Sequence, residues 1–195
     1  DIKYYTEPWS YAIVDNFLPQ ETFNELVEYC KALGVDTPVT KQLNTHFEDN
    51  QNLKEKIDTL VKIFKDLSFN ILNTPNKELL ETDQAMYHLQ FREPGHNQGP
   101  HPDIWSKVFS LVLYIYPFEG PSGTEILTPQ GNYFSEVEWK PNRVMAFIPS
   151  NNPETKTYHA VYNTKEFNRA ALVINYLNNN YFWLFFNKDS TPVFI

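Results

Sequence analysis

The chain has 195 residues, of which 42% are hydrophobic and 16% are aromatic. This composition is typical of a globular protein with a substantial core and excludes an intrinsically disordered chain. The formal net charge of -8 repels a phosphate backbone, so we expect no nucleic-acid partner. No apolar run reaches the length needed to cross a bilayer, so we also expect no membrane partner.

The chain contains a single cysteine, Cys30. It therefore cannot form an intramolecular disulfide or a cysteine-rich zinc site, and the cysteine is expected to act as a small buried hydrophobe. The chain also has no Asn-x-Ser/Thr sequon, which agrees with a cytoplasmic location. We expect a cytoplasmic protein, and the sequence leaves its oligomeric state open.

Residues 1–80 are predicted to form a helical support for the rest of the fold. A short strand is expected at residues 11–17. Apolar residues at helical spacing then predict a helix over residues 21–33, which Gly34 ends. A second helix is predicted at residues 52–72, with an apolar stripe on one face and lysines on the other.

From residue 83 onward the sequence is rich in aromatic residues and alternates with a period of two, which predicts β-structure. Strands are expected at residues 83–91, 107–116, 124–128, 132–139, 143–148, 157–162 and 169–177, separated by turns rich in Gly, Pro and Asn. Many short strands indicate a sandwich or barrel, with the helices packed against one sheet. No repeat or linker interrupts the chain, so we expect one domain over residues 1–195, with a core at about 81–180.

His101 and Asp103 follow a loop rich in glycine and proline and precede a long apolar run. In extended chain, residues two apart point to the same face, so an imidazole nitrogen and a carboxylate oxygen can converge on one cation. An isolated His-x-Asp also occurs by chance, and the competing interpretation is a hydrogen-bonded surface pair.

A third metal ligand must come from elsewhere in the chain. A metal that reacts with oxygen needs protein ligands on one side and open positions on the other, and two histidines and a carboxylate on a triangular face provide this. His88 and His96 precede the motif too closely to complete such a triangle, and His46 lies in a predicted loop ahead of the β region. His159 opens a predicted strand and is the best candidate, with a structural role in a half-buried strand as the alternative.

Arg169 follows His159 by ten residues and begins an otherwise apolar strand. A buried guanidinium needs a counter-charge because it cannot release its proton. Glu166 is the nearest acidic residue in the sequence, and an ion pair with it is one explanation. The other is a carboxylate of a bound small molecule, held through two parallel hydrogen bonds.

These residues and three further segments resemble the iron(II)- and 2-oxoglutarate-dependent dioxygenases, specifically the prolyl-4-hydroxylase-like branch. Segment 89–95 (LQFREPG) resembles the strand and glycine turn that precede the family's His-x-Asp. Segment 110–116 (SLVLYIY), with the GxxGTE that begins at Gly120, resembles its "LxYL…GGxT" stretch. Segment 139–149 (WKPNRVMAFIP) resembles the proline turn and apolar strand ahead of the distal histidine. The resemblance covers about residues 83–177.

The resemblance implies a double-stranded β-helix, that is, a cupin-like jelly roll, with helices packed on one sheet. It implies that His101, Asp103 and His159 bind catalytic Fe(II), that 2-oxoglutarate places its far carboxylate on Arg169, and that O2 takes the last coordination position. Tyr114 stands where the family often has a tyrosine hydroxyl beside that carboxylate, although a core aromatic is the alternative. The implied reaction hydroxylates a C–H bond of a peptide or small-molecule substrate and releases succinate and CO2.

The chain departs from the family at two positions near the expected cosubstrate. Arg92 replaces a tyrosine that touches the cosubstrate in prolyl hydroxylases, and Ala171 replaces a serine found in some relatives. Either the cosubstrate pocket is therefore built differently, or Arg92 faces the substrate. We add Arg92, Trp105 and Glu125 as candidate substrate residues, each with an ordinary packing or surface role as the alternative.

A second class of protein also fits the metal-binding pattern. A cupin-like metal-binding module or isomerase would keep the metal ligands without activating oxygen, and it would have no need of Arg169. A zinc hydrolase fits less well, because the sequence offers no clear base paired with the site.

Overall fold

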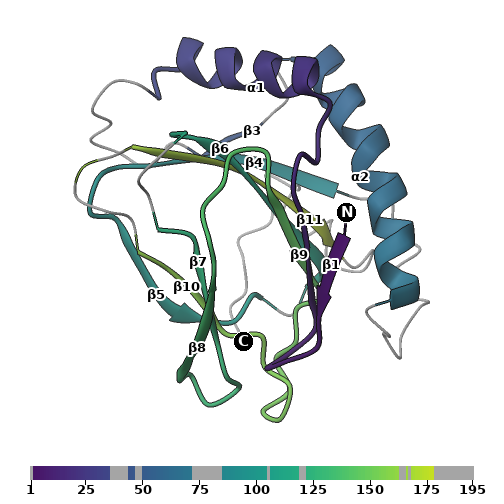
Figure 1. The fold of residues 1–195 in the computed structure, drawn as a ribbon, viewed down its shortest axis with the longest axis vertical. Helices are drawn as coiled ribbons and strands as arrows, with labels where there is room; N and C mark the ends of the chain where they lie inside the picture. Colours follow the sequence, from purple (N-terminus) through teal and green to yellow (C-terminus); the bar gives the residue numbers. More distant parts are fainter. Residues whose placement is uncertain are drawn as a thin grey trace, which may run out of the picture.

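The structure, a computed structural model, describes residues 2–35, 44–46, 50–71, 85–104, 106–118, 122–162, 166 and 168–177. It consists of two antiparallel β-sheets and two helices (Figure 1). The elements in chain order are β1 (Ile2–Tyr5), β2 (Tyr11–Val14), α1 (Gln20–Ala32), β3 (Asn44–His46), α2 (Gln51–Ile71), β4 (Ala85–Arg92), β5 (Asn97–His101), β6 (Lys107–Tyr116), β7 (Thr124–Leu127), β8 (Tyr133–Val137), β9 (Val144–Phe147), β10 (His159–Tyr162) and β11 (Arg169–Leu177).

The larger sheet has seven strands in the order β1-β2-β9-β6-β11-β4-β3, and the smaller sheet has four in the order β5-β10-β7-β8. Sequence neighbours such as β4 and β5, or β9 and β10, lie in different sheets, so the chain crosses repeatedly from one sheet to the other. This crossing brings residues that are far apart in the sequence onto the two facing surfaces.

The helices cover the outer face of the larger sheet (Figure 1). Phe23 and Leu26 of α1 and Ile57 of α2 are buried against the sheet residues Leu111 and Leu113. Along β6 these leucines alternate with side chains that face the smaller sheet, as the period of two requires. Neither helix in the described part of the chain is long and apolar enough to span a membrane.

A second apolar cluster lies between the two sheets. Met145 and Phe147 of β9 pack there against Ile126 and Val137 of the smaller sheet. Trp9, from the loop between β1 and β2, joins them. This cluster fills part of the space between the layers and borders the cavity described below.

The predicted helices and strands are present, and three strands were missed. Among the described strands, β1, β3 and β5 lie at sheet edges, where each pairs with a single neighbour. Strand β5 runs through the predicted glycine- and proline-rich loop, which an edge strand tolerates because one side of its backbone needs no ladder partner. His46 therefore lies in a strand, paired with His88, and not in a loop.

Candidate active site

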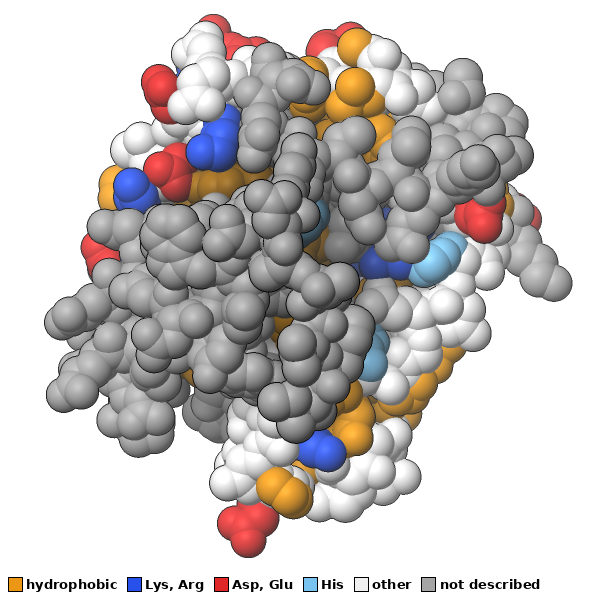
Figure 2. All heavy atoms as spheres, turned by 180° about the vertical axis from the view of Figure 1, so that it is seen from behind, with side chains coloured by type: hydrophobic (Ala, Val, Ile, Leu, Met, Phe, Trp, Pro, Cys, Tyr) orange, Lys and Arg blue, Asp and Glu red, His pale blue; other side chains and the backbone are white. Residues whose placement is uncertain are grey.

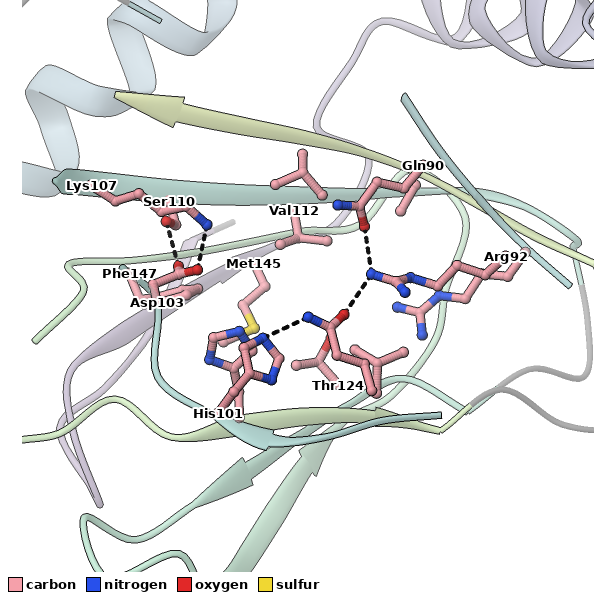
Figure 3. A pocket seen from close by; sticks show the side chains of 16 residues that line it. Gln90, Arg92, His101, Asp103, Lys107, Ser110, Val112, Thr124, Met145 and Phe147 are labelled. Atoms are coloured by element: carbon pink, nitrogen blue, oxygen red, sulfur yellow. Dashed lines mark hydrogen bonds and ion pairs between the residues drawn. The ribbon is translucent and has the colours of Figure 1, made fainter. Parts of the chain in front are cut away.

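A cavity of about 80 Å³ lies between the two sheets (Figure 3). His101, Asp103, His159 and Arg169 all line it, together with polar residues from β4, β5 and β6. The structure thus brings together four residues that span 68 positions of the sequence, from 101 to 169. On the face shown in Figure 2, histidine and basic side chains lie next to one another.

His101 and His159 are direct cross-strand partners in the pairing of β5 with β10. Their ring centroids are 4.5 Å apart. Each Nδ1 contacts the carbonyl oxygen two residues earlier, Gly99 at 2.8 Å and Thr157 at 3.1 Å. A carbonyl can only accept, so Nδ1 carries the proton and Nε2 keeps its lone pair, which is the arrangement of a metal-binding histidine.

His159 is neutral at neutral pH. Burial lowers the pKa of its imidazole to about 4, and the nearby carboxylate of Asp103 only partly opposes this effect. A neutral imidazole is the form that binds a metal ion.

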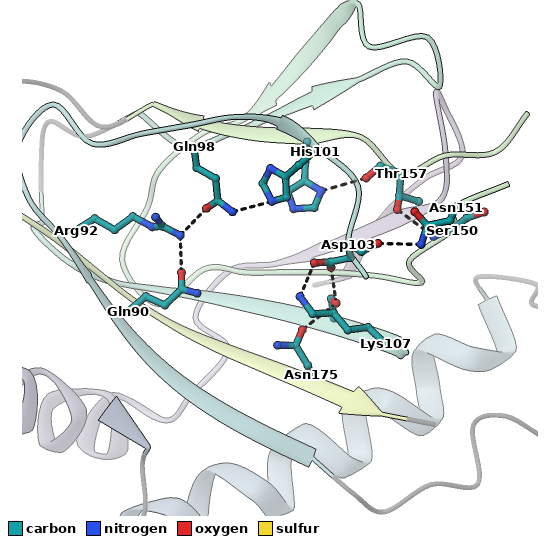
Figure 4. Close-up of polar contacts among 12 residues, drawn as sticks. Gln90, Arg92, Gln98, His101, Asp103, Lys107, Ser150, Asn151, Thr157 and Asn175 are labelled. Atoms are coloured by element: carbon teal, nitrogen blue, oxygen red, sulfur yellow. Dashed lines mark hydrogen bonds and ion pairs between the residues drawn. The ribbon is translucent and has the colours of Figure 1, made fainter. Parts of the chain in front are cut away.

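Asp103 lies just after β5 and is 8% exposed. Its carboxylate pairs with Lys107 Nζ and accepts a hydrogen bond of 2.8 Å from Ser110 Oγ (Figure 4). Burial disfavours its charge, but Lys107 and His159 outweigh burial and hold the pKa of Asp103 below its usual value. Asn151 Nδ2 donates to the Asp103 backbone carbonyl at 2.9 Å and fixes the chain there.

The convergence of His101 and Asp103 on one cation stays a prediction. No three metal-binding side chains in the described part of the chain are close enough to form a ready-made site. The reason is that Asp103 lies beyond the end of β5, outside the regular alternation, and its carboxylate turns toward β6. The donor set of two imidazoles and one carboxylate in a single cavity nevertheless fits Fe(II).

Arg169 is a buried cation with few partners. The residue is 2% exposed, its Nη1 donates to Gly123 O at 3.4 Å, and its Nε has no hydrogen-bond partner among the described residues. Its guanidinium lies 4.5 Å from the ring centroid of Trp139 and 5.4 Å from that of Tyr114. Burial lowers the pKa of Arg169 to about 10, so it stays charged at neutral pH.

No described carboxylate forms an ion pair with Arg169, and Glu166 is exposed. The ion pair considered from the sequence is therefore not formed. A buried guanidinium with an unsatisfied donor at a cavity wall suits an anionic ligand, since such a group is costly without a partner.

Tyr114 does not line the cavity. Its hydroxyl donates to Thr124 Oγ1 at 2.7 Å, and its ring stacks on Trp139 with centroids 4.5 Å apart. Thr124 does line the cavity. Tyr114 therefore supports Arg169 and Thr124 from behind, and the packing role considered from the sequence describes its place in this structure.

Arg92 lines the cavity and lies directly opposite Arg169 in the pairing of β4 with β11. Its guanidinium donates to Gln90 Oε1 at 2.9 Å and to Gln98 Oε1 at 2.5 Å, and it also contacts His96. Gln98 Nε2 lies 2.8 Å from His101 Nε2, which completes a polar chain from Arg92 to His101 (Figure 4).

The other two candidate substrate residues lie elsewhere. Glu125 does not line the cavity, because it alternates with Thr124 on β7 and faces the other side. Burial and the facing Glu136 raise the pKa of Glu125. Trp105 lies outside the described residues.

Sequence reasoning missed Gln98, Lys107 and Ser110. Lys107 follows Asp103 by four residues, and Ser110 occupies an inward position of β6. Alternation along β6 could have placed Ser110 in the cavity, whereas the contacts of Gln98 depend on a strand that the sequence does not indicate.

Solved structures with similar folds include prolyl hydroxylases. A Pseudomonas putida prolyl-4-hydroxylase matches with a TM-score of 0.63 and 16% identity over 87% of this chain and 92% of that one. A viral collagen prolyl hydroxylase from Paramecium Bursaria Chlorella virus-1, in a 2OG complex, matches with a TM-score of 0.55 and 14% identity. The match covers 86% of this chain and 96% of that one. A Trichoplax adhaerens prolyl hydroxylase, in complex with a hypoxia inducible factor peptide fragment, matches with a TM-score of 0.60 and 12% identity. The match covers 87% of this chain and 84% of that one.

The chain has the jelly-roll fold of the prolyl hydroxylases. The predicted fold class, mainly β with helices on one sheet, is therefore confirmed. No protein-family model and no curated protein matches the chain, so the similarity is one of fold.

Proposed function

We propose that this protein is a dioxygenase that uses Fe(II), 2-oxoglutarate and O2 to hydroxylate a C–H bond of a peptide or small molecule. One observation carries the proposal: Arg169, a buried cation with an unpartnered Nε, lines the same cavity as His101, His159 and Asp103. A metal ion alone would not require that arginine, whereas a metal ion together with a dicarboxylate would.

His101, His159 and Asp103 would hold the iron, and Arg169 would pair with the far carboxylate of 2-oxoglutarate. The bound iron would supply oxidative decarboxylation of 2-oxoglutarate to succinate and CO2, coupled to oxidation of the substrate. The neighbouring viral enzyme, described as a 2OG complex, supports the cosubstrate.

The chain's own residues prepare the site for these ligands. The carbonyl oxygens of Gly99 and Thr157 accept from the two Nδ1 atoms, which leaves the lone pair of each imidazole on Nε2. Trp139 and Tyr114 pack against the Arg169 guanidinium and keep water from it, which strengthens its pairing with a carboxylate. Arg169 thereby sets the direction in which a dicarboxylate would enter the cavity.

A peptide is the first substrate class to test. The Trichoplax adhaerens neighbour is described in complex with a peptide fragment, which supports a peptide substrate for this chain. Free amino acids and other small metabolites form the second class, because Arg92 adds a further cation to the cavity wall.

Anaerobic addition of Fe(II) and 2-oxoglutarate tests the proposal directly. We expect a weak visible charge-transfer band, which His101→Ala should abolish because it removes one ligand. Succinate formation should then be followed with prolyl peptides, free amino acids and small metabolites, and a stimulating compound identifies the substrate. Absence of the band at saturating 2-oxoglutarate would contradict the proposal.

A further inference from the structure

Two of the three proposed metal ligands already hold a hydrogen-bond donor of the chain itself. Lys107 Nζ lies on Asp103 Oδ1, and Gln98 Nε2 lies 2.8 Å from His101 Nε2. Both donors line the cavity beside the ligands they contact (Figures 3 and 4). The atoms that a metal ion would need are therefore engaged.

Lys107 and Ser110 together occupy both oxygens of the Asp103 carboxylate. Lys107 begins β6 four residues after Asp103, and the two side chains are 17% and 8% exposed. Water therefore screens this ion pair less than a surface pair. An ammonium is a compact point charge with three donors, so on Oδ1 it takes the place of a cation. Ser110 donates to Oδ2 at 2.8 Å and adds no charge.

Gln98 is fixed in the orientation that engages His101. Its Oε1 accepts from Arg92 Nη2 at 2.5 Å, so its Nε2 must face the imidazole. His101 Nδ1 donates to Gly99 O, which leaves the lone pair on Nε2 as the acceptor for Gln98. A metal ion on His101 would need this same lone pair.

We propose that Lys107 and Gln98 are internal competitors of the metal ion, which cap Asp103 and His101 until the metal displaces them. This inference rests on the proposed function, because it concerns the same three ligands. It means that the affinity of the site for metal is set below the value that its ligands alone would give. Metal binding would also take from Arg92 one of its acceptors, at the end of the cavity where Arg169 lies.

The competing account gives the opposite sign. If Lys107 instead supported Asp103 as an orienting neighbour, its removal would weaken metal binding, by about 10- to 100-fold for a typical supporting group. If Lys107 competes, its removal should strengthen metal binding by about 10-fold or more, because one charged hydrogen bond no longer has to break.

The test is a titration of the metal-free protein with Co(II), followed by its visible absorption, for the wild type, four variants, and His101→Ala as the baseline that lacks one ligand. Lys107→Met and Gln98→Met remove the competing donors and keep much of the side-chain volume, and both should bind Co(II) more tightly. Lys156→Met removes a positive charge that contacts Tyr158 and neither competitor, so it should bind as the wild type does. Ser110→Ala removes a neutral hydrogen bond that orients the Asp103 carboxylate and takes away no competing cation, so it should bind Co(II) more weakly.

The outcomes separate the inference from the proposed function. Equal or weaker Co(II) binding by Lys107→Met, with wild-type binding intact, would overturn the competition and leave the dioxygenase proposal standing. Failure of every protein to bind above the level of His101→Ala would overturn the proposed function itself. Lys107→Gln is the second variant if Lys107→Met does not fold, and it carries the same expectation.

Discussion

Arg169 is the residue on which the proposed chemistry depends most. It is buried against two aromatic rings, and one of its nitrogens has no hydrogen-bond partner. An unpaired buried charge destabilises the folded protein unless a bound ligand of opposite charge offsets the effect. This arginine is therefore better explained by an anion that binds than by the folded chain alone.

Replacing Arg169 by Met should separate binding from stability. The affinity for 2-oxoglutarate, measured by calorimetry with Mn(II) in the site, should fall by about 10- to 100-fold as one charge-assisted pair is lost. The thermal midpoint of the ligand-free protein should stay the same or rise, because an uncompensated buried charge is gone.

Arg169→Lys is the control that keeps the positive charge but cannot form two parallel hydrogen bonds with a carboxylate. It should recover only part of the affinity for 2-oxoglutarate. Unchanged affinity in Arg169→Met would favour the cupin-like module or isomerase over a dioxygenase.

At the scale of elements, the central strands were the ones that sequence patterns predicted best. Strands β6 and β11 have the bounds expected for them, since each is paired on both sides and carries a long apolar run. The missed strands β1, β3 and β5 are edge strands, whose short or polar sequences show no clear alternation. Sequence patterns reveal a strand through its buried apolar residues, and an edge strand has few of them.

The same limit applied to the candidate site. His101, His159 and Arg169 were placed in one cavity from motif spacing and family resemblance, and the structure agrees with that grouping. The contacts of Asp103 with Lys107 and of Gln98 with His101 depend on how the chain leaves β5, which no periodic pattern describes. The contact of Tyr114 with the cosubstrate stays a prediction: its ring stacks on Trp139 and does not line the cavity.

Gly123, just before β7, permits a close approach that no other residue allows. A Cβ atom added there would lie 1.7 Å from the carbonyl oxygen of Val137 on β8. Gly123→Ala should therefore force β7 and β8 apart and lower the free energy of unfolding by about 2 kcal/mol or more in a denaturant titration. It should also disturb Arg169, which donates to the Gly123 carbonyl.

Gly99 offers the matched control for this prediction. A Cβ atom at Gly99 would meet no atom within 4 Å, so Gly99→Ala should leave the free energy of unfolding nearly unchanged. Equal destabilisation by the two substitutions would mean that the backbone contact at Gly123 is not what requires glycine there.

At the scale of the whole molecule, the N-terminal segment is part of the β-structure and not only a helical support. Strands β1 and β2 extend the larger sheet, and β2 pairs with β9. Asp15, just after β2, accepts hydrogen bonds from Arg143 at 2.6 and 3.1 Å and from Lys140 at 3.0 Å. These contacts join the N-terminal segment to the turn before β9, more than a hundred residues away.

The Asp15 contacts predict sensitivity to acid. The hydrogen bond from Arg143 lowers the pKa of Asp15 to about 2, below the value near 4 of an unfolded chain. A depressed carboxyl pKa stabilises the fold above the unfolded value, and that stability is lost as the pH falls from about 4 to about 2. Asp15→Asn should lower the free energy of unfolding at neutral pH and flatten its fall over this range.

Glu154→Gln, an exposed substitution, serves as the control and should leave the acid profile as it is in the wild type. An unaltered profile in Asp15→Asn would place the acid sensitivity in other carboxyl groups.

The position of His101 at the end of an edge strand has a mechanical consequence. In the described part of the chain, strand β5 is paired only with β10, and His101 faces His159 across that pairing. In the proposed dioxygenase, iron bound to both imidazole rings would link β5 to β10 and stabilise this edge strand. Amide hydrogen exchange in β5 should then slow when metal is added. In the iron-free protein, the pairing of β5 with β10 would be weaker.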